Sequence, residues 1–257
     1  MTNINLQNNE LPSLNKLHLL TDTTAGVFSD AYWDIRSHRK AIEKHIEKIT
    51  VDVSSASDLR SYSEPEQENL AALLHIKSVL VDAEKSLSAT IVPYCNSFAV
   101  GRWALSQFGV GPLSTVKLLQ HIDVSKARTH ENLWAYAGFA PKSGNKNPYN
   151  GALKEACLDL GRSFVKHSAN PSCFYGGLYL KEYERRVQLN DQGAYQELAK
   201  DESGSFSSER LSLDRIRSQA QRYAIKIFLV HWYTLEYKDL YNTEYVTENK
   251  NIIPVPR

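Results

Sequence analysis

The sequence lacks most of the features that are typical of a secreted protein, a membrane-spanning protein or a protein stabilised by a bound metal ion. Its 257 residues include 3 cysteines, Cys95, Cys157 and Cys173, which are too few and too widely spaced for a disulfide framework or a metal site. No apolar run approaches the length that crosses a membrane. The N-terminal residues lack the basic and apolar regions of a secretory signal. These absences predict a cytoplasmic protein with buried or idle thiols.

Nucleotide-binding patterns are also missing, although two glycines lie at the start of a predicted helix, where such patterns place them. Gly109-Val110-Gly111 comes directly before an apolar helical pattern. A dinucleotide fingerprint needs a preceding strand and a third glycine, but Ser114 occupies that third position and the preceding segment reads as helix. The Walker pattern is absent as well. We therefore exclude a nucleotide pocket and expect no cofactor and no metal.

Positive charge is concentrated around these glycines. Residues 100–190 hold 12 Lys and Arg against 6 Asp and Glu, whereas residues 1–99 hold 9 against 13. The whole chain carries a formal net charge of only +1. This distribution favours a local phosphate-binding face on an otherwise neutral protein.

No stretch shows the sustained alternation of a strand, so the sequence predicts an all-α fold. We expect a long helical pair, then a helix-hairpin-helix core, then a long C-terminal helix. The predicted boundaries are a polar arm over 1–25, the helical pair over 26–93, a transposase-like domain over 94–240 with a mobile excursion near 190–209, and a tail over 241–257.

Local signals set the expected helix ends. Ser29 or Asp30 is the expected N-cap of the first helix, and residues 95–107 are expected to form one helix before the glycines. Pro112 is expected at the first position of the next helix, and Thr129 is a typical N-cap. A final helix of about 30 residues should end near residue 241.

The glycine segment is typical of a helix-hairpin-helix module. Such a hairpin presents backbone N–H groups at the start of its second helix to a DNA phosphate, which positions the protein without reading the base sequence. The alternative is a glycine turn that only packs two helices. The predicted DNA-binding residues are Gly109, Val110, Gly111, Leu113, Lys117, Arg102, Lys126, Lys142, Lys146 and Lys154.

Residues 109–141 resemble the C-terminal transposase domain of insertion-sequence transposases related to the Piv invertases. In that domain a glycine hairpin precedes an aromatic segment, a Ser-Gly loop, and a helix that begins near an Asn and a basic residue. The matching segments here are Leu133–Phe139 with Pro141, Ser143-Gly144, and Asn150–Lys154.

A closer likeness, over about residues 94–240, is to stand-alone transposase-like proteins of phages and mobile elements. It is carried by Tyr149-Asn150, Leu153-Lys154, Leu160–Lys166, Phe174-Tyr175, Leu178-Tyr179, Arg222–Lys226 and His231. The resemblance implies a DNA-associated protein of a bacterial host cell.

The resemblance also singles out a serine. In the related transposases a loop serine is the proposed nucleophile toward DNA, and Ser143 is the matching residue. Lys142, Lys146 and Lys154 would supply the positive field that activates a serine. The loop is shorter than in that family, however, and residues 1–93 do not read as its ribonuclease-H-like domain. Ser143 is therefore better interpreted as a solvated loop residue.

We predict a DNA-binding protein of a phage or mobile element that grips the DNA backbone and is not catalytic. A serine-dependent strand-transfer or recombinase component is one alternative. A protein-interaction module, anti-defence or regulatory, that has lost DNA binding is another. The expected partners are DNA, in branched or distorted form among others, a second copy of the chain, and a further protein.

Overall fold

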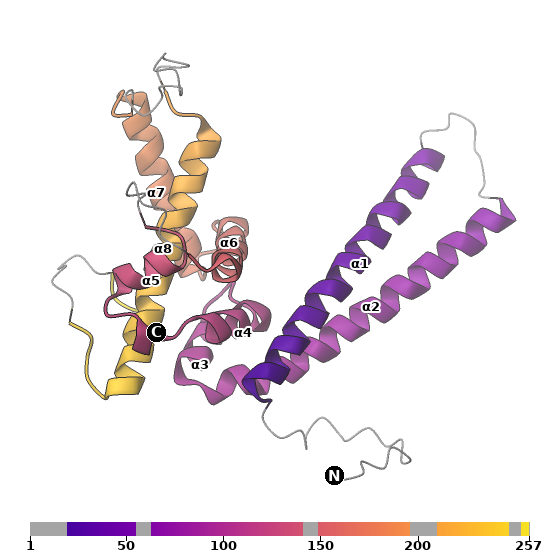
Figure 1. Ribbon diagram of the computed structural model, residues 1–257. Coiled ribbons are helices and arrows are strands. Elements are labelled where there is room, and N and C mark those ends of the chain that lie inside the picture. The colour runs from indigo at the N-terminus through magenta and orange to yellow at the C-terminus, as the bar shows by residue number, and fades with distance from the viewer. Residues whose placement is uncertain (1–19, 55–62, 141–148, 196–209, 247–252, 257) are drawn as a thin grey trace, which may run out of the picture. The chain divides into compact units, whose positions relative to one another are not determined.

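The computed structural model describes residues 20–54, 63–140, 149–195, 210–246 and 253–256. Every regular element in these ranges is a helix, which confirms the predicted all-α fold class (Figure 1). The chain divides into two compact units, Met1–Tyr94 and Cys95–Arg257. No helix in the described ranges is both long and apolar enough to span a membrane.

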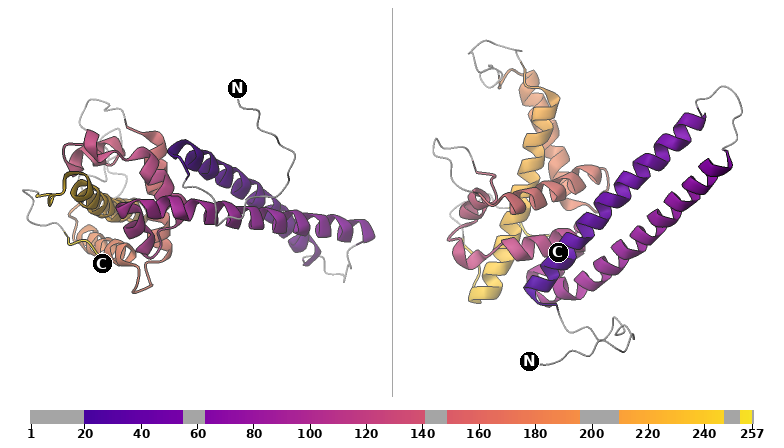
Figure 2. Two further views of the ribbon diagram at one scale, coloured as in Figure 1. Left: turned by 90° about the horizontal axis from the view of Figure 1, so that it is seen from below. Right: turned by 45° about the vertical axis from the view of Figure 1, so that its right-hand side comes forward.

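Unit 1 is an antiparallel pair of long helices, α1 (Asp22–Ser54) and α2 (Glu64–Ser97), which run alongside each other in the right-hand view of Figure 2. Three contacts between the helices show the antiparallel order. The Tyr94 hydroxyl donates to Asp22 over 2.9 Å, Arg39 pairs with Glu84 at 2.5 Å, and Lys77 pairs with Glu43 at 3.2 Å.

The facing sides of α1 and α2 follow the three-and-four spacing of a coiled coil. On α1 these positions are Ala25, Phe28, Tyr32, Ile35, Arg39, Ile42, Ile46 and Ile49. On α2 they are Leu70, Leu73, Lys77, Leu80, Glu84, Leu87, Ile91 and Tyr94. The middle of this seam is polar, because Arg39, Lys77 and Glu84 occupy positions that are elsewhere mostly apolar.

The predicted start of the first helix was wrong. α1 begins at Asp22, so residues 22–25 belong to the helix and not to the polar arm. Thr21 caps the helix, because its hydroxyl accepts from the Thr24 N–H over 3.3 Å. Ser29 is fully buried within α1, and its hydroxyl has no hydrogen-bond partner among the described residues. It therefore cannot act as an N-cap.

The helix expected over residues 95–107 is broken. α2 continues through Pro93 to Ser97, Phe98 is extended, and α3 (Ala99–Ser106) follows. The chain turns very tightly here, since a Cβ atom on Gly101 would lie 2.1 Å from the Cys95 carbonyl oxygen. Only glycine permits this close approach.

Unit 2 contains the remaining helices, and three local predictions for them are confirmed: Pro112 at the start of one helix, Thr129 as an N-cap, and the end of the last helix at residue 241. The helices are α4 (Pro112–His121), η2 (Val124–Lys126), α5 (His130–Tyr136), α6 (Gly151–Lys166), α7 (Phe174–Asp191) and α8 (Leu213–Tyr241). Pro112 opens α4, and the side chains of Thr129, Asn150 and Ser212 cap α5, α6 and α8. Most of the excursion expected near 190–209 lies outside the described residues.

The core of unit 2 forms around α8, and the C-terminal residues pack against it. Phe228, Trp232 and Tyr233 of α8 are fully buried. His231 donates to the Ile253 carbonyl over 2.7 Å and accepts from the Tyr175 hydroxyl over 2.7 Å. Residues 253–256 of the expected tail are thus attached to the core of this unit.

Candidate nucleic-acid interface

The glycine segment forms a tight hairpin between α3 and α4. The Val110 N–H donates to the Gln107 carbonyl over 3.0 Å, which closes the turn. Gly109 has φ of +90°, a conformation that side chains with a Cβ rarely adopt. Val110 between the two glycines is buried in the core of the unit. The hairpin is therefore fixed both by its backbone and by an apolar anchor.

Two side chains from outside the hairpin hold its carbonyl groups. The Ser163 hydroxyl on α6 donates to the Gly109 carbonyl over 2.6 Å, and the Cys173 thiol donates to the Phe108 carbonyl over 3.5 Å. Burial raises the pKa of Cys173, so its sulfur keeps the proton that it donates. His167 packs edge-on against Phe108, with ring centroids 5.5 Å apart.

Sequence reasoning missed these supporting residues. Ser163 lies 54 positions from Gly109, and Cys173 lies 65 positions from Phe108. Neither has a local pattern that would associate it with a distant turn. Only the packing of α6 against α4 brings Ser163 to the hairpin.

Gly111 has a different role from the one its sequence suggests. A glycine in a tight turn suggests a φ above zero, but Gly111 has φ of −102° and ψ of 167°, which any residue adopts. A Cβ atom there would meet nothing within 4 Å. The strained position of the hairpin is Gly109 alone.

The N-terminus of α4 follows the hairpin and has no side-chain cap. Gly111 is its N-cap residue and has no side chain to accept a hydrogen bond from the first turn. The first N–H groups of an α-helix have no partner within the helix, and here they belong to Leu113 and Ser114, since Pro112 has none. Such groups, together with the positive end of the helix dipole, form an environment that suits a phosphate.

The predicted basic residues fall into three groups. Arg102 on α3 and Lys117 on α4 lie on the two helices that the hairpin joins. Lys126 and Lys154 lie on η2 and α6, and each has another contact: Lys126 pairs with Asp123 at 2.8 Å, and Lys154 lies 4.3 Å from the centre of the Tyr149 ring. Lys142, Ser143 and Lys146 lie outside the described residues.

The two ends of the segment that contains Ser143 are held together. The Asn150 N–H donates to the Tyr136 carbonyl over 2.8 Å, and the Asn150 side chain donates to the Tyr136 hydroxyl over 2.9 Å. Gly138 has φ of +74°, and a Cβ there would press within 3.1 Å of Lys154 and Tyr149. The chain thus leaves the core at residue 140 and returns at 149 beside Lys154.

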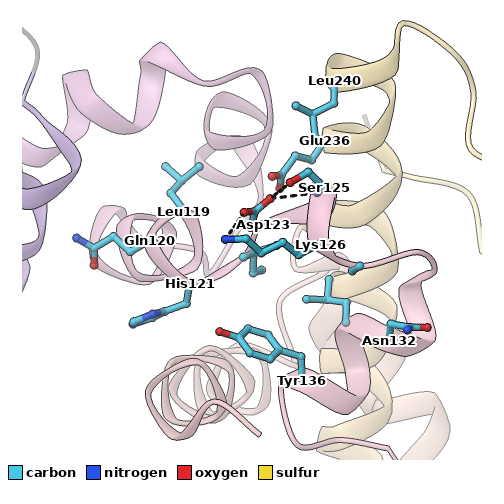
Figure 3. Close-up of a pocket in the computed structure, with 13 residues that line it drawn as sticks. Leu119, Gln120, His121, Asp123, Ser125, Lys126, Asn132, Tyr136, Glu236 and Leu240 are labelled. Carbon is cyan, nitrogen blue, oxygen red and sulfur yellow. Dashed lines mark hydrogen bonds and ion pairs between the residues drawn. The ribbon is translucent and has the colours of Figure 1, made fainter.

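Lys126 lines a cavity of about 620 Å³ between the C-terminal end of α4, η2, α5 and α8 (Figure 3). Asp123, Tyr136 and Glu236 are in the same lining. Burial raises the pKa of Glu236 to about 7, although the Trp232 indole donates to its carboxylate over 2.6 Å. Polar residues of all these elements line the cavity, and Lys126 is already paired with the Asp123 carboxylate there.

No protein-family model matches the chain, and neither a curated protein nor a solved structure matches it. Among the described residues, no three side chains of His, Cys, Asp or Glu are placed to hold a metal ion together. The hairpin is the feature of the described structure whose geometry best fits a ligand class expected from the sequence.

Proposed function

We propose that this protein binds DNA through the sugar–phosphate backbone, using the hairpin between α3 and α4. The observation that carries the proposal is the rigid turn at Gly109 in front of the uncapped N-terminus of α4. Ser163 and Cys173 hold the hairpin carbonyls on one side. The N–H groups of Leu113 and Ser114 are then available as donors to a phosphate oxygen.

The basic residues support the same ligand. Arg102 and Lys117 lie on the two helices that flank the hairpin, and a cation near a helix N-terminus strengthens the attraction of a phosphate. Backbone contacts of this kind position a protein on DNA and carry no base information. The proposed activity is therefore binding without sequence preference and without strand cleavage.

The resemblance to the transposase domain of Piv-related insertion sequences supports the same proposal. It extends the proposal to a phage or other mobile element as the setting in which the protein acts. Branched or distorted DNA is then the expected natural ligand, because recombination intermediates have these forms.

We also propose that two copies associate through unit 1. Its helices expose large apolar side chains away from their shared seam: Leu74, Ile76 and Val79 on α2 are 48%, 45% and 53% exposed, and Val27 on α1 is 59% exposed. A pair of helices that buries so little apolar surface gains from association with a second pair. Sedimentation equilibrium tests this proposal, and a monomer at all concentrations would contradict it.

A gel-shift panel of single-stranded, duplex and branched DNA, with and without Mg²⁺, tests the proposed DNA binding. We expect binding to all sequences of one shape with similar affinity and a steep loss of affinity as salt rises. Lys117→Ala should lower the slope of log affinity against log salt by about 0.9 for duplex DNA, the value for one phosphate contact. No binding to any of these DNAs at low salt would contradict the proposal.

A further inference from the structure

Basic and aromatic side chains also gather at the place where the chain leaves and re-enters the core around residues 140 and 149. We define this basic–aromatic patch by Trp134, Tyr149, Lys154, Arg222 and Lys226. It lies on α5, the start of α6 and the middle of α8, and includes none of the hairpin residues. α5 and α8 lie against each other in Figure 1.

Direct contacts hold the patch together. The Lys226 ammonium lies 4.9 Å from the centre of the Trp134 ring, and the Trp134 indole donates to the Lys226 carbonyl over 3.1 Å. The Phe139 N–H donates to the Trp134 carbonyl over 2.8 Å, so the turn at Gly138 is part of the same surface. Lys154 and Tyr149 pack against that turn and against each other.

The cations of the patch have no carboxylate partner in the described part of the chain. The ion pairs found there involve other basic residues. Arg222 lies one helical turn before Lys226 on α8, on the same face. Burial and the charge of Arg222 both lower the pKa of Lys226. An anion bound between these two residues would relieve their repulsion.

The aromatic members restrict the kind of anion. Tyr149 is 52% exposed, and a cation covers one face of its ring. An exposed ring beside a cation that has no carboxylate partner among the described residues suits a nucleic-acid base next to its phosphate, because bases stack on aromatic side chains while the backbone meets the charge. Bases inside a duplex are already stacked on one another, so this arrangement favours a single strand.

We propose that the basic–aromatic patch binds single-stranded DNA, and that it does so independently of the hairpin. The proposal rests on the proposed function in one respect, namely that DNA is the nucleic acid bound. A protein with one site for a duplex backbone and another for a single strand would prefer DNA in which the two meet, such as a flap or a branch.

The test is fluorescence anisotropy of the full chain with a labelled thymidine oligonucleotide and with a labelled duplex, each over a range of salt. The double variant Arg222→Gln/Lys226→Gln should lower the salt slope for the single strand by about 1.4, which is two phosphate contacts at about 0.7 each. The slope for the duplex should stay as in the parent. The double variant Arg222→Gln/Lys226→Arg keeps the charge at position 226. It should therefore regain part of the single-strand salt slope that Arg222→Gln/Lys226→Gln loses.

Lys238→Gln is the matched control, because Lys238 is also on α8, is 58% exposed and is paired with Glu244. It removes one charge from the same helix outside the patch and should leave both slopes unchanged. Tyr149→Leu removes an exposed ring and should weaken single-strand binding about tenfold without changing duplex binding. Because Tyr149 is exposed, this variant keeps the test valid should the double variant unfold.

Each result bears on a different claim. An unchanged single-strand slope in the double variant, with duplex binding intact, would overturn this inference and leave the proposed function standing. An equal loss of single-strand and duplex binding would show a general backbone site and would also overturn it. Tighter binding of a uridine oligoribonucleotide than of the thymidine oligonucleotide would overturn the choice of DNA. Failure of the parent to bind any DNA would overturn the proposed function itself.

Discussion

The helical pair of unit 1 and the packed core of unit 2 are built on different kinds of contact. The seam of α1 and α2 has charged residues at its middle, where Arg39 meets Glu84, and only a few of its side chains are fully buried. In unit 2 large aromatic residues such as Phe164, Tyr175 and Phe228 are fully buried around one long helix. The first arrangement fixes the register of two helices, and the second builds a rigid frame for the hairpin.

This difference bears on the function that we propose. A frame that is rigid by itself can hold backbone N–H groups in the geometry that a phosphate needs before the phosphate arrives. A helical pair with exposed apolar residues is better suited to association than to precise positioning. The following predictions test the contrast between the units, beginning with the largest expected effect.

Phe228→Ala should have the largest effect on stability. Its ring is fully buried and packs within 5.1 Å of Tyr175 and 5.3 Å of Trp103, measured between ring centroids. We expect the free energy of unfolding to fall by about 3–5 kcal/mol, as measured by urea denaturation. In the monomer, at concentrations too low for two copies to associate, Val79→Ala in unit 1, where the side chain is 53% exposed, should change it by less than about 0.5 kcal/mol. A similar loss of unfolding free energy in the two variants would contradict the difference in packing between the core of unit 2 and the helical pair of unit 1.

Glu236→Gln should change the pH dependence of stability in unit 2. The pKa of Glu236 is raised from 4.5 to about 7, so the folded state holds this proton more tightly than the unfolded state. The resulting stabilisation is complete below pH 4.5 and is lost as the pH rises through about 7. A glutamine at position 236 stays neutral at every pH, so the variant does not lose this stability as the pH rises.

The variant should therefore match the parent at low pH and exceed it by roughly 2–4 kcal/mol above neutral pH. Denaturation of both proteins across this pH range measures the difference. A difference that does not depend on pH would show that Glu236 titrates normally in the folded state.

Glu84→Gln should destabilise unit 1 by about 1–2 kcal/mol, because Arg39, whose side chain is only 17% exposed, then keeps Glu43 at 2.8 Å as its one carboxylate partner among the described residues. Circular dichroism during thermal unfolding would follow the loss of helix. Arg39→Leu/Glu84→Leu removes both charges and should recover most of the stability. A double variant less stable than the single one would mean that the ion pair itself stabilises the seam more than apolar contacts would.

Ser143→Ala should have the smallest effect. We expect no covalent adduct with DNA from either the parent or the variant after denaturation, and a change in stability below about 0.5 kcal/mol. Denaturing electrophoresis of labelled DNA after incubation is the measurement. An adduct that depends on Ser143 would make the protein a serine-dependent recombinase component, with Lys142, Lys146 and Lys154 as the first activators to examine.

Much of unit 2 could be predicted because its helix ends depend on local chemistry. Thr129 accepts a hydrogen bond from the first turn of α5, and Pro112 fits the first position of α4. These interactions involve residues within a few positions of each other, so sequence alone contains them. The helical pair of unit 1 was also predicted, but Leu74, Ile76 and Val79 are apolar and exposed, so apolar residues alone do not identify the facing side of α2.

The remaining features depend on contacts between distant residues. Nothing near Gly109 indicates that Ser163 will donate a hydrogen bond to its carbonyl, and nothing near His231 indicates that the Ile253 carbonyl will accept a hydrogen bond from its ring. The break at Phe98 follows from the close approach of Gly101 to Cys95, which a helical pattern does not show. Gly109 and Gly111 also differ in conformation, and part of the reason is local, since Gly111 precedes Pro112, which favours an extended backbone, whereas Gly109 precedes Val110.

That difference between the two glycines offers the most direct test of the central claim. Val at position 109 must adopt φ of +90° or distort the hairpin, at a cost of about 1–3 kcal/mol, whereas Val at position 111 fits the extended backbone and meets no neighbour within 4 Å. The measurement is the affinity of Gly109→Val and Gly111→Val for duplex DNA over a range of salt, with unfolding curves to show that both are folded. We predict a loss of at least about tenfold for Gly109→Val and a change of less than about twofold for Gly111→Val. Parent-like duplex binding by a folded Gly109→Val protein would show that the hairpin is not the DNA contact.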